Sequence, residues 1–161
     1  MTVAVNLWRV AEETREYKAN DLSGRGAAKY PGRWNAHGEH VVYAATTLSL
    51  AVLETVAHID GAGLPLNRFA VLITVPIATW NARQELTWSA TDPAWSAIPA
   101  GRASVELGSA WYQSAKSALL LVPSVIVPEE SAVLINATHA DAKGIRARTI
   151  RAFAYTSLFR E

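Results

Sequence analysis

The stretch that decides the fold of this chain is residues 32–56, GRWNAHGEHVVYAATTLSLAVLETV. It begins as a glycine-punctuated loop, continues through a short apolar run and ends in a helical pattern. It also carries a guanidinium, aromatic rings and a carboxylate, among them Arg33, Tyr43 and Glu54, whereas most of the chain is ordinary apolar filling. This stretch is therefore the first candidate for a functional site.

The apolar run and the helix that follows it are predicted from their patterns. Residues 41–45 predict a short strand, and Thr46 or Thr47 is a candidate N-cap for a helix that runs to about residue 59. Apolar residues occupy most sides of that helix. Glu54 is therefore expected on a buried element, where a carboxylate needs a partner or a function.

The rest of the chain contains more predicted strands than helices. Strands are expected at residues 3–10, 68–75, 118–122, 132–135 and 145–153, a helix at 103–114, and loops at 22–38 and, with short helical pieces, at 77–99. Because strands and helices do not alternate regularly, the pattern favours an α+β fold over a doubly wound sheet.

Size and composition predict one compact domain covering residues 1–161, since the chain has 161 residues, of which 50% are hydrophobic and 18% charged. The longest apolar runs are shorter than the roughly 20 residues that a membrane span needs. No basic segment followed by a long apolar one begins the chain. With no cysteine, the chain has neither a disulfide framework nor a thiolate site. These features fit a cytoplasmic protein without a membrane association.

The charge distribution gives no general electrostatic case for binding nucleic acid, because the net charge is only +1. Arg146 and Arg148 alternate with smaller or apolar residues, as on the exposed face of an edge strand. A phosphate-binding strip or a surface for a partner remains the alternative for this basic segment.

Three side chains of the central stretch suggest a ligand site. Arg33 follows a glycine in a loop and suits a phosphate or carboxylate, although a loop arginine is often only a surface residue. Tyr43 on a strand and Glu54 on the next helix would suit a flat heterocycle and a cationic sugar centre. The alternatives are core packing for Tyr43 and a structural ion pair of Glu54 with Arg9 or Arg33. Arg9, within a predicted strand, either meets an anion or points to solvent.

Other catalytic patterns are missing from the sequence. His37 and His40 are three apart, but they lie in a loop without an HExxH pattern or a carboxylate cluster, so no metal is expected. GxGxxG and GxxxxGK[ST] are also absent. Ser124 lies in VPSVIVP rather than in a GxSxG elbow, so its hydroxyl is interpreted as a hydrogen-bonding group and not as a nucleophile.

Four motifs, taken together, make the chain resemble the RES-domain toxins of bacterial RES–Xre type II toxin–antitoxin pairs. The motifs are LWRV at 7–10, the stretch at 32–54, LLLVPSVIVPEE at 119–130 and LINATH at 134–139. They occur in the order of the family and span nearly the whole chain. Ala137 departs from the family, which usually has a proline there, and this affects only the rigidity of that turn.

The resemblance implies a single domain similar to the ADP-ribosyltransferase catalytic fold. It also implies a toxin that cleaves the nicotinamide–ribose bond of NAD⁺, as a glycohydrolase or phosphorylase, and arrests growth by depleting NAD. The alternative is a mono-ADP-ribosyltransferase that modifies a specific cellular protein. In either case NAD⁺ is the substrate, and no cofactor is expected. A non-catalytic interaction module is the alternative of a different class.

Matched to the family position by position, Arg33, Tyr43 and Glu54 are the expected catalytic residues. Arg9 and Ser124 are the expected substrate-binding residues. In that scheme Glu54 stabilises an oxocarbenium-like ribose, the arginines hold the pyrophosphate, and Tyr43 stacks on or positions the nicotinamide. The resemblance further implies a hetero-oligomer with a cognate helix-turn-helix (Xre-like) antitoxin. DNA would then be bound only through that antitoxin.

Overall fold

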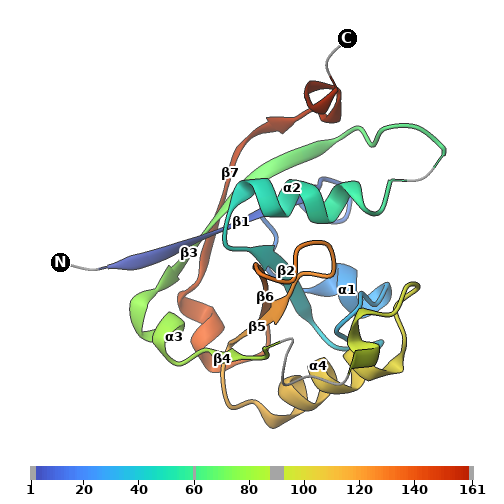
Figure 1. Ribbon diagram of the computed structural model, residues 1–161. Helices are drawn as coiled ribbons and strands as arrows, with labels where there is room; N and C mark the ends of the chain where they lie inside the picture. The colour runs from blue at the N-terminus through green and yellow to red at the C-terminus, as the bar shows by residue number, and fades with distance from the viewer. Residues whose placement is uncertain (1–2, 60, 88–92, 160–161) are drawn as a thin grey trace.

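The computed structural model of the chain describes residues 3–59, 61–87 and 93–159 (Figure 1). Its strands are β1 (Ala4–Glu12), β2 (Val41–Ala45), β3 (Arg68–Pro76), β4 (Gln84–Glu85), β5 (Leu119–Pro123), β6 (Ser131–Asn136) and β7 (Arg146–Phe153). Its helices are α1 (Arg25–Lys29), α2 (Leu48–Val56), α3 (Ile77–Asn81) and α4 (Arg102–Ser114), with short 3₁₀ turns at Pro93–Ser96, Ala140–Gly144 and Tyr155–Leu158. The predicted α+β class is confirmed.

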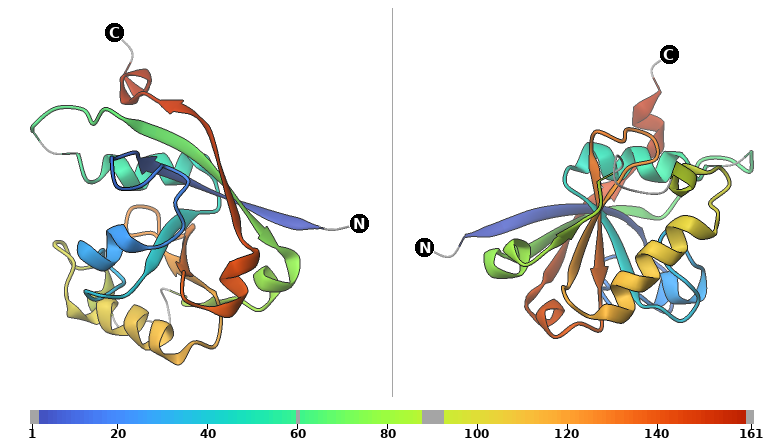
Figure 2. Two further views of the ribbon diagram at one scale, coloured as in Figure 1. Left: turned by 180° about the vertical axis from the view of Figure 1, so that it is seen from behind. Right: turned by 60° about the horizontal axis from the view of Figure 1, so that its bottom comes forward.

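The strands form one seven-stranded sheet in the order β4-β5-β6-β2-β1-β3-β7. β1 pairs with β3 along its whole length, but it meets β2 only where Trp8 lies opposite Ala45. The sheet therefore divides at this point into two parts. Figure 2 shows from two further directions that β1, β3 and β7 diverge from β2, β6 and β5.

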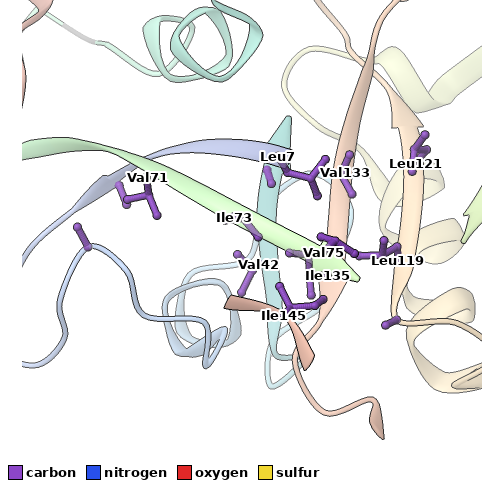
Figure 3. Close-up of a cluster of buried hydrophobic side chains, with 14 residues drawn as sticks. Leu7, Val42, Val71, Ile73, Val75, Leu119, Leu121, Val133, Ile135 and Ile145 are labelled. Carbon is purple, nitrogen blue, oxygen red and sulfur yellow. The ribbon is translucent and has the colours of Figure 1, made fainter. Parts of the chain in front are cut away.

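The main hydrophobic core lies between the two diverging parts (Figure 3). Its largest buried side chains are Leu7, Val42, Val71, Ile73, Val75, Leu119, Leu121, Val133, Ile135 and Ile145. Because alternate residues of a strand point to opposite faces, Val42 enters this core while its neighbour Tyr43 points to the other face of β2. The same alternation that builds the core therefore directs Tyr43 away from it.

Helix α2 covers β1 and β2 through a second apolar cluster. Leu50, Ala51 and Val52 pack there against the strands and against the buried Tyr155. The predicted cap is confirmed, because Thr47 Oγ1 accepts a hydrogen bond of 3.1 Å from the backbone N–H of Leu50. The helix ends at Val56, before the predicted residue 59, because the next residues tighten into turns with shorter-range hydrogen bonds.

Both predicted loops contain regular structure, of which only the short helical pieces of the 77–99 segment were expected. The 22–38 loop includes the short helix α1, which begins after Gly24, a residue in the left-handed conformation with φ 71°. A Cβ at Gly24 would lie 2.6 Å from the carbonyl carbon of His40, so the glycine permits a close backbone approach. The 77–99 segment includes α3 and the two-residue β4, which is too short for a detectable period. Residues 88–92 of that segment lie outside the described residues.

At the far edge of the sheet, β7 has the exposed basic side that the sequence predicts. Arg146 and Arg148 are exposed, whereas Ile145 just before the strand is buried. In the described part of the chain, no helix is both long and apolar enough to cross a membrane.

Candidate functional site

A pocket of about 60 Å³ opens in the fork where β1 and β2 separate. Arg9 of β1 and Tyr43 of β2 line it, and the connection between these strands adds Asp21, Arg25 and neighbouring residues. The divergence of the two strands leaves this space, because paired strands would be only about 4.8 Å apart. The pocket therefore brings together two residues selected from distant parts of the sequence.

Arg9 lines this pocket, and its guanidinium has no hydrogen-bond or ion-pair partner among the described residues. The residue is half-buried, and its Nε atom is fully buried with no hydrogen-bond acceptor within the described residues. Burial lowers the pKa of Arg9, and the charge of Asp21 and the ring of Tyr17 act in the opposite direction. Asp21 is itself bonded to the backbone N–H and hydroxyl of Ser23. Arg9 therefore retains hydrogen-bonding capacity for an anion.

Arg33 lies in the loop between α1 and β2 and is also half-buried. Its Nη1 donates hydrogen bonds of 3.0 and 2.8 Å to the carbonyl oxygens of Trp95 and Ala97. Burial lowers the pKa of Arg33, and the nearby charge of Glu54 raises it. The structure therefore brings Arg33 and Glu54, from different segments, near enough for their charges to interact.

Glu54 lies near the C-terminal end of α2, and its environment is unusual for a carboxylate. The residue is half-buried, and its Oε1 atom is fully buried with no hydrogen-bond donor among the described residues. No described arginine, lysine or histidine lies within 4.0 Å of it, so the structural ion pair with Arg9 or Arg33 considered above is absent. Buried polar atoms normally have partners, so this unpartnered carboxylate oxygen makes Glu54 a candidate functional residue.

Tyr43 has a hydroxyl that is fully engaged with the loop that carries Arg33. The hydroxyl donates a 2.6 Å hydrogen bond to Asn35 Oδ1 and accepts a 3.1 Å bond from the backbone N–H of Trp34. Burial raises the pKa of Tyr43 well above its ordinary value of 10.0. The ring abuts Gly32, where a Cβ would lie 2.8 Å from the ring carbon Cζ. Tyr43 thus connects the pocket to the Arg33 loop.

Ser124 follows β5 and is only 1% exposed. Its Oγ accepts hydrogen bonds of 3.1 and 3.2 Å from the backbone N–H groups of Ile126 and Val127, which closes a turn. Val127 packs against the cluster that holds α2. Ser124 makes no hydrogen bond to Glu54 in the described structure, but its own O–H remains available as a donor.

The five selected residues therefore form two groups and one outlier. Arg9 and Tyr43 line the pocket, whereas Arg33 and Glu54 interact through their charges outside its lining. Ser124 supports a turn beside the α2 cluster. The described residues contain no group of three or more His, Asp or Glu side chains that could hold a metal ion.

Two buried polar residues of this region were not selected from the sequence. Asn35 is 1% exposed and makes several hydrogen bonds within the Arg33 loop. Glu39 is 4% exposed, and its carboxylate accepts bonds from Ala36 N, Ser109 Oγ and Gln113 Nε2. Both residues lie in an irregular loop, and the backbone groups of a buried loop need side-chain partners. This is the feature of the sequence that could have identified them.

Fold and site together define an α+β protein with a guanidinium and an aromatic ring at a fork in its sheet. A second guanidinium lies near a carboxylate whose buried oxygen has no partner among the described residues. The model of the RES domain family matches residues 6–156. The chain belongs to this family, which confirms the resemblance inferred from its motifs.

Named relatives agree with this assignment. The chain is 50% identical over 153 residues to the "Prs ADP-ribosylating toxin" of Sphingobium sp. (strain YBL2), a match that covers 95% of each protein. It is 36% identical over 126 residues to the "Toxin Res" of Yersinia enterocolitica, covering 78% of this chain and 80% of that toxin.

A solved structure shares the fold. A chain of the M. tuberculosis MbcT–MbcA toxin–antitoxin complex superposes with a TM-score of 0.65 at 15% identity, covering 94% of this chain and 86% of the other. At this identity the likeness concerns the fold alone. It supports the expected α+β architecture.

Proposed function

We propose that this protein is a toxin that cleaves the nicotinamide–ribose bond of NAD⁺. The observation that carries the proposal is the buried, unpartnered Oε1 of Glu54 beside the charge of Arg33. Leaving a buried polar atom without a partner costs about 1–3 kcal/mol, which a ligand interaction would offset. An ionised carboxylate in this position suits the cationic ribose that forms as nicotinamide leaves.

The other selected residues fit the remaining parts of the dinucleotide. Arg9 and Arg33 supply guanidinium groups that suit a pyrophosphate, since charge-assisted bonds to phosphate oxygens are among the stronger hydrogen bonds in proteins. The ring of Tyr43, with its hydroxyl engaged elsewhere, offers an aromatic surface for positioning nicotinamide. Ser124 has a free O–H with which to bond the ligand or orient Glu54. In this scheme NAD⁺ is consumed as substrate, and the chemistry uses neither a metal nor a cofactor.

The acceptor of the ADP-ribosyl unit defines two versions of this function. With water or phosphate as acceptor, the protein depletes NAD⁺ and thereby arrests growth. A protein acceptor is favoured by one specific observation, the name of the Sphingobium relative at 50% identity, a toxin that ADP-ribosylates Prs. Both versions use the same bond cleavage and the same Glu54.

We also propose that the toxin acts with a cognate antitoxin of the helix-turn-helix, Xre-like class in a hetero-oligomer. The support is family membership and the fold shared with a chain of a solved toxin–antitoxin complex. The net charge of +1 gives this chain no electrostatic basis for holding DNA itself, so DNA contact is assigned to the antitoxin.

The test of the proposed chemistry is to incubate pure protein with NAD⁺ labelled in the adenylate part. Buffer alone, added phosphate and added cell extract form the three arms, and Glu54→Gln is the control in each. Released nicotinamide with free ADP-ribose, or with ADP-ribose 1-phosphate, supports depletion. Label on a protein band supports the transferase. Absence of nicotinamide release in all three arms contradicts the proposed function.

A matching test in cells follows NAD during expression of the toxin without its antitoxin. Growth arrest with a fall in intracellular NAD supports depletion, and arrest with unchanged NAD supports modification of a protein. Glu54→Gln is expected to abolish the arrest in both versions.

A further inference from the structure

Asn35 uses every hydrogen-bonding position of its side chain, and its bonds connect the loop that carries Arg33 to α1 and β2. Its Oδ1 accepts bonds of 2.9 Å from the backbone N–H of Gly32 and of 2.6 Å from the hydroxyl of Tyr43. Its Nδ2 donates bonds of 2.9 Å to the carbonyl oxygens of Ala27 and Ala36. A buried amide with two acceptor and two donor contacts has its full normal complement of partners.

These contacts fix the backbone on both sides of Arg33. The N–H of Gly32 is held by Asn35, and the N–H of Trp34 is held by the Tyr43 hydroxyl, which Asn35 orients in turn. The carbonyl of Arg33 accepts a 2.8 Å bond from the hydroxyl of Ser104 on α4. The main chain around Arg33 is therefore held by side chains from its own loop, from β2 and from α4. The guanidinium itself is held only through Nη1, which donates to the carbonyl oxygens of Trp95 and Ala97 among the described residues.

The chemistry of the amide is specific to this arrangement. A carboxylate at position 35 would keep the acceptor but lose both donors, and it would face the carbonyl oxygens of Ala27 and Ala36. An alanine would remove the acceptor of the Gly32 N–H and of the Tyr43 O–H, and a donor to two carbonyl groups. The Ala36 carbonyl would keep only its 3.2 Å bond from the N–H of Glu39. Only a side chain that both donates and accepts at this length satisfies all four contacts.

We infer that Asn35 is the positioning residue for Arg33, and that it acts through the loop and the Tyr43 hydroxyl rather than through contact with substrate. The inference rests on the proposed function, because it assigns to Arg33 the binding of the NAD⁺ pyrophosphate. A guanidinium displaced by about 1 Å loses its geometry toward substrate, and such displacements reduce activity by up to about 100-fold. Asn35 thus determines the productive geometry of Arg33 from a distance.

A double-mutant cycle between Asn35 and Arg33 tests this role in the full chain. Asn35→Ala is expected to raise the KM for NAD⁺ by about 10-fold or more in the otherwise natural protein. It is expected to raise the KM less than about twofold in an Arg33→Ala background, because the residue through which it acts is then missing. Equal effects in both backgrounds would overturn the inference.

Asn136 provides the matched control. It is also a 1% exposed asparagine, its Nδ2 donates to the carbonyl of Tyr112, and its Oδ1 accepts from Thr138. Asn136→Ala is expected to destabilise the fold without changing the KM for NAD⁺. A KM change equal to that of Asn35→Ala would show a general effect of destabilisation and would also contradict the positioning role.

A readout without NAD⁺ separates this inference from the proposed function. The Nε–H resonance of Arg33 is the one that disappears in Arg33→Lys. Its order parameter is expected to be lower in Asn35→Asp than in Asn136→Asp. Asn35→Asp is nearly isosteric and serves if Asn35→Ala does not fold. If the natural protein releases no nicotinamide, the proposed function fails while this measurement still tests the positioning role. An unchanged Arg33 resonance in Asn35→Asp overturns it.

Discussion

Arg33 and Glu54 interact through their charges but do not form an ion pair. Glu54 raises the pKa of Arg33 against the effect of burial, yet the Nη1 of Arg33 is bonded to the carbonyl groups of Trp95 and Ala97. The two charges therefore interact, but they make no ion pair within 4.0 Å. Such an arrangement leaves the carboxylate and the rest of the guanidinium for a substrate.

Replacing the Glu54 carboxylate by an amide is expected to remove activity without weakening the fold. Glu54→Gln should lower the kcat for nicotinamide release by about 100-fold or more, as loss of one electrostatic stabiliser does in other enzymes. Its free energy of unfolding should stay within about 1 kcal/mol of the natural protein, because Oε1 has no partner to lose. Urea denaturation and steady-state kinetics measure the two quantities.

Glu39→Gln is the control for that change. Glu39 is a buried carboxylate whose oxygens accept three hydrogen bonds, one from the backbone of Ala36 and two from α4. The amide nitrogen of glutamine cannot accept the bonds made to the oxygen that it replaces, so the fold should lose about 1–3 kcal/mol. Equal stability losses in Glu39→Gln and Glu54→Gln would contradict the unpartnered state of Glu54.

Removing the guanidinium of Arg9 is expected to weaken NAD⁺ binding while leaving the free energy of unfolding unchanged or higher. Burial lowers the pKa of Arg9, so its charged form at neutral pH opposes folding. Arg9→Met keeps the apolar stem, and the KM for NAD⁺ should rise about 10-fold or more if one charge-assisted bond to phosphate is lost. Arg148→Met on the exposed edge strand is the control, and a similar rise in that variant would argue against a specific contact.

The contribution of the Tyr43 hydroxyl to stability is expected to depend on pH at the alkaline end. Because the pKa of Tyr43 is raised in the folded protein, tyrosine in the unfolded chain ionises first, near its ordinary value of 10.0. The stability difference between the natural protein and Tyr43→Phe should be constant from about pH 6 to 9 and should shrink above about pH 10. Urea denaturation across this range is the measurement, and a difference that grows above pH 10 would refute the direction of the shift.

Helix α4 is expected to tolerate no side chain at Gly108. A Cβ at this position would lie 1.8 Å from the carbonyl oxygen of Trp34, so the helix or the Arg33 loop must move. Gly108→Ala should lower the free energy of unfolding by about 1–3 kcal/mol or more through overpacking. Gly26→Ala in α1, whose Cβ would have no neighbour closer than 3.7 Å, should be neutral or stabilising. Thermal denaturation of both variants is the measurement.

Ser124→Ala is expected to act first on stability. It would leave the N–H groups of Ile126 and Val127 without their acceptor, which should cost about 1–3 kcal/mol. A rise in the KM for NAD⁺ at a temperature where the variant is fully folded would also support the proposed contact between this hydroxyl and the ligand. Unchanged stability would show that the turn does not depend on Ser124.

Sequence reasoning located most elements because their signals are local. The strand at Val41–Ala45, the Thr47 cap and the helix at Arg102–Ser114 follow from a continuous apolar run, a capping residue and a helical period. All three are signals between residues that are neighbours in the sequence. Helix α1 and strand β4 were missed, because the first is five residues long in a glycine-rich segment and the second has only two residues. Elements of that length form through tertiary contacts and carry no periodic signal.

The sequence by itself determined the family, the α+β class and the candidate side chains, because spaced motifs and periodicity are properties of the chain. Only the tertiary structure decided which of those side chains meet. It separated Arg9 and Tyr43 at the fork from Arg33 and Glu54, and it showed Asn35 as the residue that holds the loop. The physical reason is that strand pairing, side-chain burial and the hydrogen bonds of buried polar groups depend on contacts between segments far apart in the sequence. Those contacts form only once the two parts of the sheet have packed around the core.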